Sequence, residues 1–216
     1  MDDAAALLPA AIALLEATAI VAFALSGLIE AARRGLDAVG VVFVAGITAF
    51  GGGTLRDLLL DRRPFFWVEH AGWLWVLLGG TLVAMAVLRA RHLRLTERAM
   101  QWPDAVGLGL FGATGTQLAL EAAMPGIVAV LMGVVTSVFG GVLRDVVCNE
   151  IPSAFRDHRP YAVCAFAGGW VLVLLQWGGA PPAASLAAGA LATVALRATA
   201  LALDVRLPAW RPDETR

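Results

Sequence analysis

An Arg-Asp pair occurs twice in this chain, each time one turn beyond adjacent glycines in an apolar segment. The first copy occupies residues 48–57 (TAFGGGTLRD) and the second, 88 positions later, occupies residues 136–145 (TSVFGGVLRD). An ionised side chain at membrane depth costs roughly 2.5–3.5 kcal/mol on insertion scales, so it normally faces a partner or water. The residue types therefore indicate that charge is handled inside a membrane, by pairing, passage or gating.

The acidic partners of the two arginines can be sought with the same offset. Glu16 and Asp104 are related by it, and each lies in an apolar segment ahead of a motif. Neighbours at i and i+1 point to different parts of a helix, so we expect Arg56 and Arg144 to pair with something other than their own aspartates. Glu16 and Asp104 are the candidates. The alternative is that the motifs lie near span ends and the arginines extend to lipid headgroups.

The glycines of the motif allow two interpretations. Gly is about 1 kcal/mol worse than Ala at an interior helix position, and in a bilayer a run of glycines invites a break that exposes backbone groups. The other interpretation is that glycines let two helices cross closely, which is common in membranes. Because Gly51, Gly52 and Gly53 recur as Gly140 and Gly141 beside a charge pair, we favour paired kinks that line a path.

Hydroxyl groups lie along the same segments, at Ser26, Thr48, Thr114, Thr136 and Ser137. They can replace the hydration of an ion, although a hydroxyl that bonds its own helix backbone is the more frequent use. The candidate pore-lining or gating residues are Glu16, Thr48, Gly51, Gly52, Gly53, Arg56, Asp57, Asp104, Thr136, Ser137, Gly140, Gly141, Arg144 and Asp145.

The elements that position these residues are predicted to be membrane helices. Of the 216 residues, 59% are hydrophobic and 15% are charged, and the mean hydropathy is +0.77. Apolar runs long enough for a hydrocarbon core of about 30 Å recur along the chain, so we expect an all-α polytopic membrane protein. The seven predicted spans are 9–30, 39–61, 71–90, 104–122, 126–148, 160–178 and 183–203.

The 88-residue offset divides these spans into two repeats within a single membrane domain. Repeat one covers about 9–90, repeat two covers about 104–178, and the seventh span at about 183–203 has no counterpart. Three spans are an odd number, so the second repeat must enter the membrane from the opposite side. The sequence therefore predicts inverted repeats, an architecture in which substrate or ion paths lie between the two halves near the midplane.

Arginine counting predicts the orientation, since the chain contains no lysine. Eleven arginines follow spans one, three, five and seven, and two lie on the opposite side. The positive-inside rule then places the N-terminus outside and the C-terminus in the cytoplasm. The eleven are Arg33, Arg34, Arg89, Arg91, Arg94, Arg98, Arg156, Arg159, Arg206, Arg211 and Arg216.

Several other kinds of protein are excluded. The net charge of -1 and the lack of a basic stripe give no indication of nucleic-acid binding. Two cysteines outside any C-x-x-C pair and three scattered histidines do not indicate a metal site. No nucleophile-base pair or phosphate loop is present, so we expect neither an enzyme nor a cofactor, and only a path for monovalent cations.

The duplicated motif and the three-plus-three-plus-one plan resemble the prokaryotic trimeric intracellular cation (TRIC) channels, over about residues 7–203. The resemblance implies a homotrimer in a prokaryotic inner membrane, with a pore inside each protomer. It also implies kinks at the glycines of spans two and five, and permeability to potassium and less selectively to sodium. The lysine of the animal proteins' motif is replaced here by Arg144. Related bacterial sequences are also labelled glycine transporters.

Two functions remain open from the sequence. In a potassium-permeable channel, carbonyls at helix breaks near Phe50 and Phe139 would face cations, and Arg56 or Arg144 would act as a movable barrier. In a secondary transporter for a small zwitterion such as glycine, helix N-termini near Thr54 and Val142 would hold the carboxylate.

Overall fold

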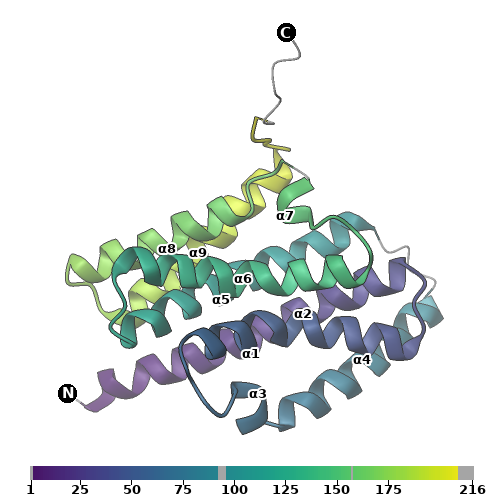
Figure 1. The fold of residues 1–216 in the computed structure, drawn as a ribbon, viewed down its shortest axis with the longest axis horizontal. Helices are drawn as coiled ribbons and strands as arrows, with labels where there is room; N and C mark the ends of the chain where they lie inside the picture. The colour runs from purple at the N-terminus through teal and green to yellow at the C-terminus, as the bar shows by residue number, and fades with distance from the viewer. Residues whose placement is uncertain (1, 92–95, 157, 209–216) are drawn as a thin grey trace.

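The structure, a computed structural model, describes residues 2–91, 96–156 and 158–208. Within these ranges the protein is a bundle of helices, seven of which have 16 residues or more (Figure 1). Two further helices have four residues each, and each follows a glycine-containing helix. The helices are α1 (Asp2–Arg33), α2 (Ala38–Leu59), α3 (Phe66–Glu69), α4 (Gly72–Arg91), α5 (Glu97–Glu121), α6 (Gly126–Val147), α7 (Ser153–Arg156), α8 (Ala162–Trp177) and α9 (Pro182–Ala202).

The seven long helices coincide with the seven predicted spans, with two clear differences at their ends. Helix α1 continues through Pro9 and begins well before the predicted start at residue 9. Helix α5 begins at Glu97 rather than at 104, because Thr96 caps it by accepting the Ala99 N–H at 3.1 Å, and the helix continues through Pro103. The polar first turns of α5 carry no hydropathy signal, so the sequence pattern missed them.

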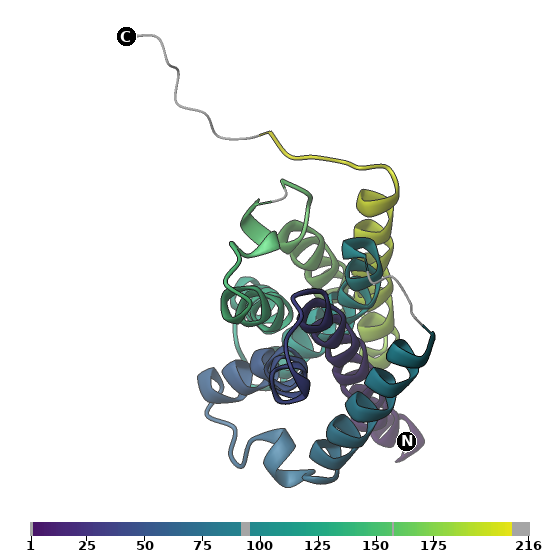
Figure 2. The same ribbon diagram turned by 90° about the vertical axis from the view of Figure 1, so that its right-hand side faces the viewer.

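Helix α5 lies at the centre of the bundle, and this explains its composition. It packs against α1, α6, α8 and α9, and nearly all its residues from Asp104 to Ala119 are buried (Figures 1 and 2). A helix that is surrounded by protein exposes little surface to lipid, so it can carry polar side chains that face other helices. Its amide and carboxyl side chains are therefore compatible with a place in the membrane.

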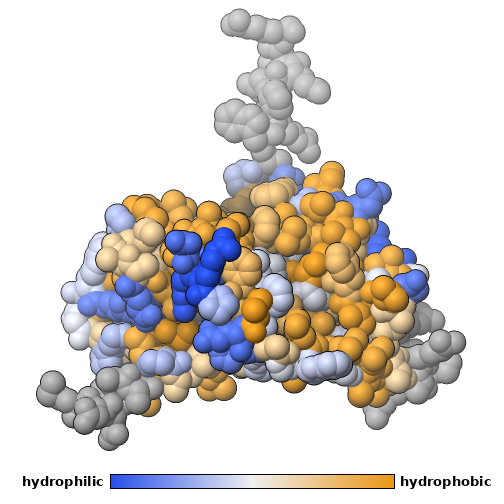
Figure 3. Space-filling view, turned by 60° about the horizontal axis from the view of Figure 1, so that its bottom comes forward, coloured by the Kyte–Doolittle hydropathy of each residue, from blue (hydrophilic) through white to orange (hydrophobic). Residues whose placement is uncertain are grey.

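The outer helices present hydrophobic side chains, as expected of a membrane protein. Four helices of the described chain are long and apolar enough to cross a bilayer, namely Leu7–Arg33, Ala38–Leu59, Gly126–Val147 and Pro182–Ala202. Two shorter apolar helices cover Gly72–Val87 and Ala162–Trp177. On the face in Figure 3, hydrophobic residues occupy much of the surface, and hydrophilic residues gather in patches.

Most of the arginine-rich connections meet at one end of the bundle. Arg34, after α1, pairs with Glu150, after α6, at 2.6 Å. Arg159, before α8, pairs with Asp204, after α9, at 2.6 Å. The start of α5 joins this end, since Glu97 lines the same small cavity as Arg34 and Glu150. Helix α5 therefore begins where α1 ends. Of the eleven arginines used for orientation, Arg94, Arg211 and Arg216 lie outside the described residues.

Candidate functional site

The two glycine motifs lie where α2 and α6 cross. A Cβ added at Gly52 would fall 1.9 Å from the carbonyl oxygen of Thr136, and one added at Gly140 would fall 2.4 Å from the carbonyl oxygen of Thr48. Both distances are far below any ordinary carbon contact, so only glycine fits at these two positions. Since 52 and 140, and likewise 48 and 136, differ by 88, the crossing is reciprocal.

The expected helix breaks at these glycines are not found. Helices α2 and α6 run without interruption from Ala38 to Leu59 and from Gly126 to Val147. The carbonyl oxygen of Phe50 accepts the Thr54 hydroxyl at 2.8 Å, so it is engaged within its own helix. Close approach of the partner backbone is a sufficient physical reason for the glycines. The prediction of half-helix ends at the motifs is therefore wrong, whereas bending of the two helices stays a prediction.

The first motif arginine, Arg56, lies between two carboxylates. We call Glu16, Arg56 and Asp57 the first charge cluster. Arg56 Nη1 donates to Glu16 of α1. Its Nε and Nη2 donate to Asp57 Oδ1 at 2.9 and 2.8 Å. The side chain of Arg56 is 1% exposed and that of Glu16 is 17% exposed, so Glu16 is less enclosed than the arginine it pairs with.

The second motif forms the equivalent second charge cluster: Asp104, Arg144, Asp145 and Ser26. Arg144 Nη1 donates to Asp104 Oδ1 of α5 and to the Ser26 hydroxyl of α1, both at 2.6 Å. Its Nε donates to Asp145 Oδ1 at 2.8 Å. Asp104 has a side chain only 4% exposed, so this cluster is more enclosed than the first.

The sequence prediction of the partners was half right. Glu16 and Asp104 do contact Arg56 and Arg144, as the offset indicated. The expectation that each arginine avoids its own aspartate is wrong. The backbone directions of i and i+1 do differ, but an arginine side chain is long enough to fold back along its helix and bring Nε to the next carboxylate. Neither arginine extends to a headgroup, because both side chains are buried.

Each motif aspartate also holds the short helix that follows it. Asp57 Oδ2 accepts the backbone N–H of Phe66, the first residue of α3, at 3.2 Å. Asp145 Oδ2 accepts that of Ser153, the first residue of α7, at 2.7 Å. The aspartates therefore stabilise the chain reversals after α2 and α6 in addition to pairing the arginines.

Four of the five predicted hydroxyl residues bond their own helices, and the fifth, Ser26, donates to Asp104 and accepts from Arg144. Thr48 and Thr136 donate to the carbonyls four residues back at 2.6 and 2.7 Å, and Ser137 donates to Val134 O at 3.1 Å. The two threonines pack beside Gly27 and Gly115, which are themselves related by the 88-residue offset. Thr48 and Thr136 therefore contribute to helix packing next to the crossing, and an ion-lining role for them is a proposal.

Two residues near the second charge cluster were not predicted as part of the site. Tyr161 at the start of α8 and Arg197 of α9 are both 3% exposed, and the Arg197 Cζ lies 4.8 Å from the centre of the Tyr161 ring. Arg197 Nη1 donates to the carbonyl oxygen of Pro160 at 2.9 Å. Nothing in the 88-residue repeat identifies them, because α9 has no counterpart and the position equivalent to Tyr161 holds Trp73. A lone arginine in an apolar span was the one available signal.

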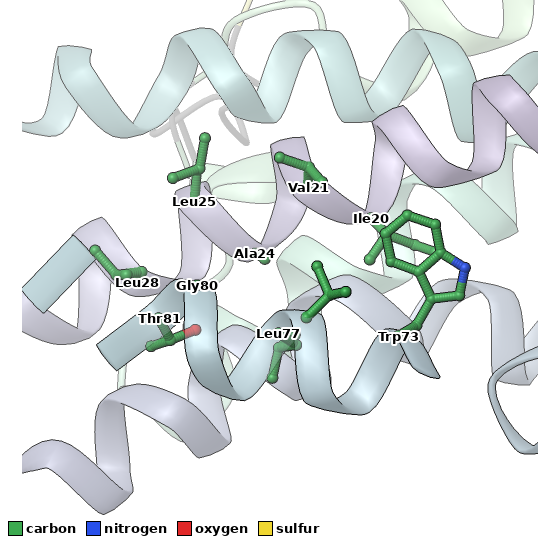
Figure 4. Close-up of a pocket in the computed structure, with 10 residues that line it drawn as sticks. Ile20, Val21, Ala24, Leu25, Leu28, Trp73, Leu77, Gly80 and Thr81 are labelled. Carbon is green, nitrogen blue, oxygen red and sulfur yellow. The ribbon is translucent and has the colours of Figure 1, made fainter. Parts of the chain in front are cut away.

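A cavity of about 130 Å³ lies between α1 and α4, and none of its lining residues belongs to a charge cluster (Figure 4). Residues of α1 such as Ile20 and Leu28 face Trp73, Leu77 and Thr81 of α4 across it. Its lining is almost wholly apolar, so it offers hardly any ligand to an ion and suits hydrocarbon instead.

The similarity to known proteins extends over most of the chain and over both repeats. A family model described as "Glycine transporter" matches residues 13–89 and again residues 101–177, two matches that are themselves 88 residues apart. The UPF0126 inner membrane protein YadS of Escherichia coli (strain K12) is 34% identical over 193 residues, which cover 89% of this chain and 92% of the relative.

Solved structures extend the similarity to the fold. A TRIC trimeric intracellular cation channel orthologue from Rhodobacter sphaeroides superposes with a TM-score of 0.83 at 36% identity, covering 90% of this chain and 98% of that one. A second TRIC cation channel structure, solved to explain conductance, superposes with a TM-score of 0.82 at 30% identity, covering 94% and 98%. The chain is thus a multi-pass membrane protein that belongs to the TRIC family, to which the glycine-transporter model and the UPF0126 proteins also correspond.

Proposed function

We propose that this protein is a monovalent cation channel, permeable to potassium, whose path runs inside each protomer between the two halves. The observation that carries the proposal is the pair of charge clusters on the crossing helices α2 and α6. The similarity to TRIC cation channels over nearly the whole chain supports the same function. The path would pass the reciprocal crossing, where Gly52 and Gly140 bring the two helices together.

The charge balance of each cluster favours a cation. Each cluster holds one guanidinium and two carboxylates, so each carries a formal surplus of one negative charge when all groups are ionised. Burial strengthens electrostatic interactions compared with water. This surplus of negative charge would repel an anion. A cation that displaces part of the arginine's interaction would gain two carboxylates as ligands.

The arginines supply the barrier in this proposal. Arg56 and Arg144 occupy the carboxylates that a cation would need, and both guanidinium groups are buried. Current would flow when an arginine moves off Glu16 or Asp104 while keeping its own neighbouring aspartate. The bond to the adjacent aspartate would then act as a tether, so that the guanidinium remains paired in both arrangements.

The carrier alternative lacks its proposed carboxylate site. A glycine carrier would hold the substrate carboxylate at helix N-termini near Thr54 and Val142, but α2 and α6 continue through both positions. The two arginines are also already shared between carboxylates. The description of the family model is the one observation that favours a carrier.

The assembly and topology are parts of the same proposal. TRIC structures are trimeric, which supports a homotrimer in the lipid of a prokaryotic inner membrane. The two matches of the family model support a single domain of two repeats, at about 9–90 and 104–178, with an added helix at about 183–203. Because α5 begins where α1 ends, the repeats would be inverted, with the N-terminus outside and the C-terminus in the cytoplasm.

The test is a single-channel recording of purified protein in a planar bilayer with a potassium gradient. Discrete unitary steps that reverse near the potassium potential are the expected result, and replacing potassium by sodium measures selectivity. Silence in the bilayer together with saturable uptake of labelled glycine into liposomes would replace the channel by the carrier. Arg56→Ala and Arg144→Ala should each change conductance or open probability, and unchanged currents in both would remove the arginines from the mechanism.

A further inference from the structure

One buried hydroxyl next to the second charge cluster has no hydrogen-bond partner. Among the residues that the structure describes, Tyr161 Oη and Arg197 Nε are the buried side-chain polar atoms without a partner. Leaving a buried hydroxyl unpaired costs about 1–3 kcal/mol, so an orphaned group of this kind calls for a physical reason. Tyr161 is also the single tyrosine of the chain.

The hydroxyl lies directly beside the groups that would move. A Cβ added at Gly141 of α6 would lie 3.2 Å from Tyr161 Oη, 3.6 Å from Asp104 Oδ1 and 3.6 Å from Arg144 Nη2. The three polar groups therefore surround the same bare face of Gly141. In the present arrangement Asp104 Oδ1 accepts hydrogen bonds from Arg144 and from Ser26, and it accepts none from the Tyr161 hydroxyl.

The ring of Tyr161 is held by α9. The Arg197 guanidinium lies over the ring and is fixed by its bond to the Pro160 carbonyl. A cation above an aromatic face is attracted to it, more so when both groups are buried. In the first half a cation also lies over the ring packed on Gly53, since the Arg56 Cζ is 5.9 Å from the centre of the Phe66 ring, but that ring has no hydroxyl.

We propose that Tyr161 is a positioning residue for the second charge cluster: when Arg144 leaves Asp104, the Tyr161 hydroxyl donates to that carboxylate in its place. The inference rests on the proposed function. In the closed arrangement the phenol lies beside Asp104 without a hydrogen bond of normal geometry, and in the open one it gains that bond, so it lowers the free energy of opening. It also keeps Asp104 facing the path as a fixed anion after the guanidinium has gone.

The first test is Tyr161→Phe in single-channel recordings, because Phe keeps the ring under Arg197 and removes only the hydroxyl. We expect the ratio of open to closed time to fall roughly tenfold, the effect of losing a hydrogen bond to a charged group. In an Asp104→Asn background the same substitution should change the ratio less than about twofold, because the two residues act together. Trp73→Phe, at the equivalent position of the other half, is the control and should leave the ratio unchanged.

Equal effects of Tyr161→Phe with and without Asp104 would overturn the inference, as would no effect in the wild-type background. A second measurement does not depend on current. Uniform 3-fluorotyrosine labelling places one ¹⁹F probe at position 161, and Arg144→Gln, which weakens the competing donor, should shift its signal in the folded protein. Adding Asp104→Asn should reverse that shift. An identical signal in Arg144→Gln with and without Asp104→Asn would refute the contact between Tyr161 and Asp104. If the shift is present but no current is recorded in the bilayer, only the channel function is refuted.

Discussion

The substitution Gly52→Ala tests whether the motif glycines serve close crossing rather than flexibility. The added methyl group would lie 1.9 Å from the Thr136 carbonyl oxygen, and real Cβ atoms essentially never approach within 3.0 Å. The two helices would have to separate by about 1.1 Å, and the obstacle is backbone that cannot rotate away. Gly51→Ala is the matched control, since its methyl group would meet only the end of the Leu143 side chain, at 2.6 Å.

The stabilities of the two variants should therefore differ. Alanine gains about 1 kcal/mol of helix propensity over glycine at either position. At Gly51 this gain offsets a small adjustment of a flexible leucine, so stability should stay within about 1 kcal/mol of the wild type. Overpacking against a rigid partner typically costs about 1–3 kcal/mol, occasionally more, so Gly52→Ala should lose about 2 kcal/mol relative to Gly51→Ala.

The assay is heat unfolding in detergent micelles followed by tryptophan fluorescence, with potassium flux from liposomes as the functional readout. A difference of 2 kcal/mol corresponds to roughly 4–8 °C in the midpoint for a chain of this size. Gly52→Ala should lower the midpoint by that amount and reduce flux, and Gly51→Ala should do neither. Equal losses in the two variants would show that flexibility of the glycine run matters, and the close-crossing argument would then fail.

Further predictions concern the other half, the orientation and the pH response. Gly140→Ala should destabilise the protein like Gly52→Ala, whereas Gly79→Ala in α4, where an added methyl group meets nothing within 4 Å, should not; unfolding midpoints distinguish them. In a cysteine-free background, Asp61→Cys should react with an impermeant maleimide from outside intact cells, and Asp204→Cys only after permeabilisation, and the reverse pattern would invert the topology. Hydrogen bonds from Arg159 hold the pKa of Asp204 below its ordinary value. This tie between Arg159 and Asp204 therefore contributes to stability at neutral pH, and the contribution is lost as the pH falls through the lowered pKa. The midpoint difference between wild type and Asp204→Asn should accordingly vanish once the pH falls below this lowered pKa; a difference that persists in acid would exclude the tie.

The sequence predicted the helices and the partners of the arginines because both depend on patterns that the chain repeats. Each predicted span overlaps one long helix of the described chain, four of which are long and apolar enough to cross a bilayer, and the 88-residue offset connected Glu16 with Asp104. It could not distinguish a helix break from a close crossing, because glycine permits both and only the position of the partner backbone decides. Nor could it predict Tyr161, whose place beside Asp104 depends on α9, a helix outside the repeat.

The two charge clusters are equivalent in chemistry but not in surroundings, and this difference bears on conduction. In the first cluster the carboxylate that Arg56 would release is Glu16, whose side chain is 17% exposed. In the second it is Asp104, which is 4% exposed and also bonded by Ser26. Separating a buried ion pair costs more than separating one that water can partly solvate. On the proposed function, release of Arg144 from the more enclosed Asp104 is therefore the step that limits opening.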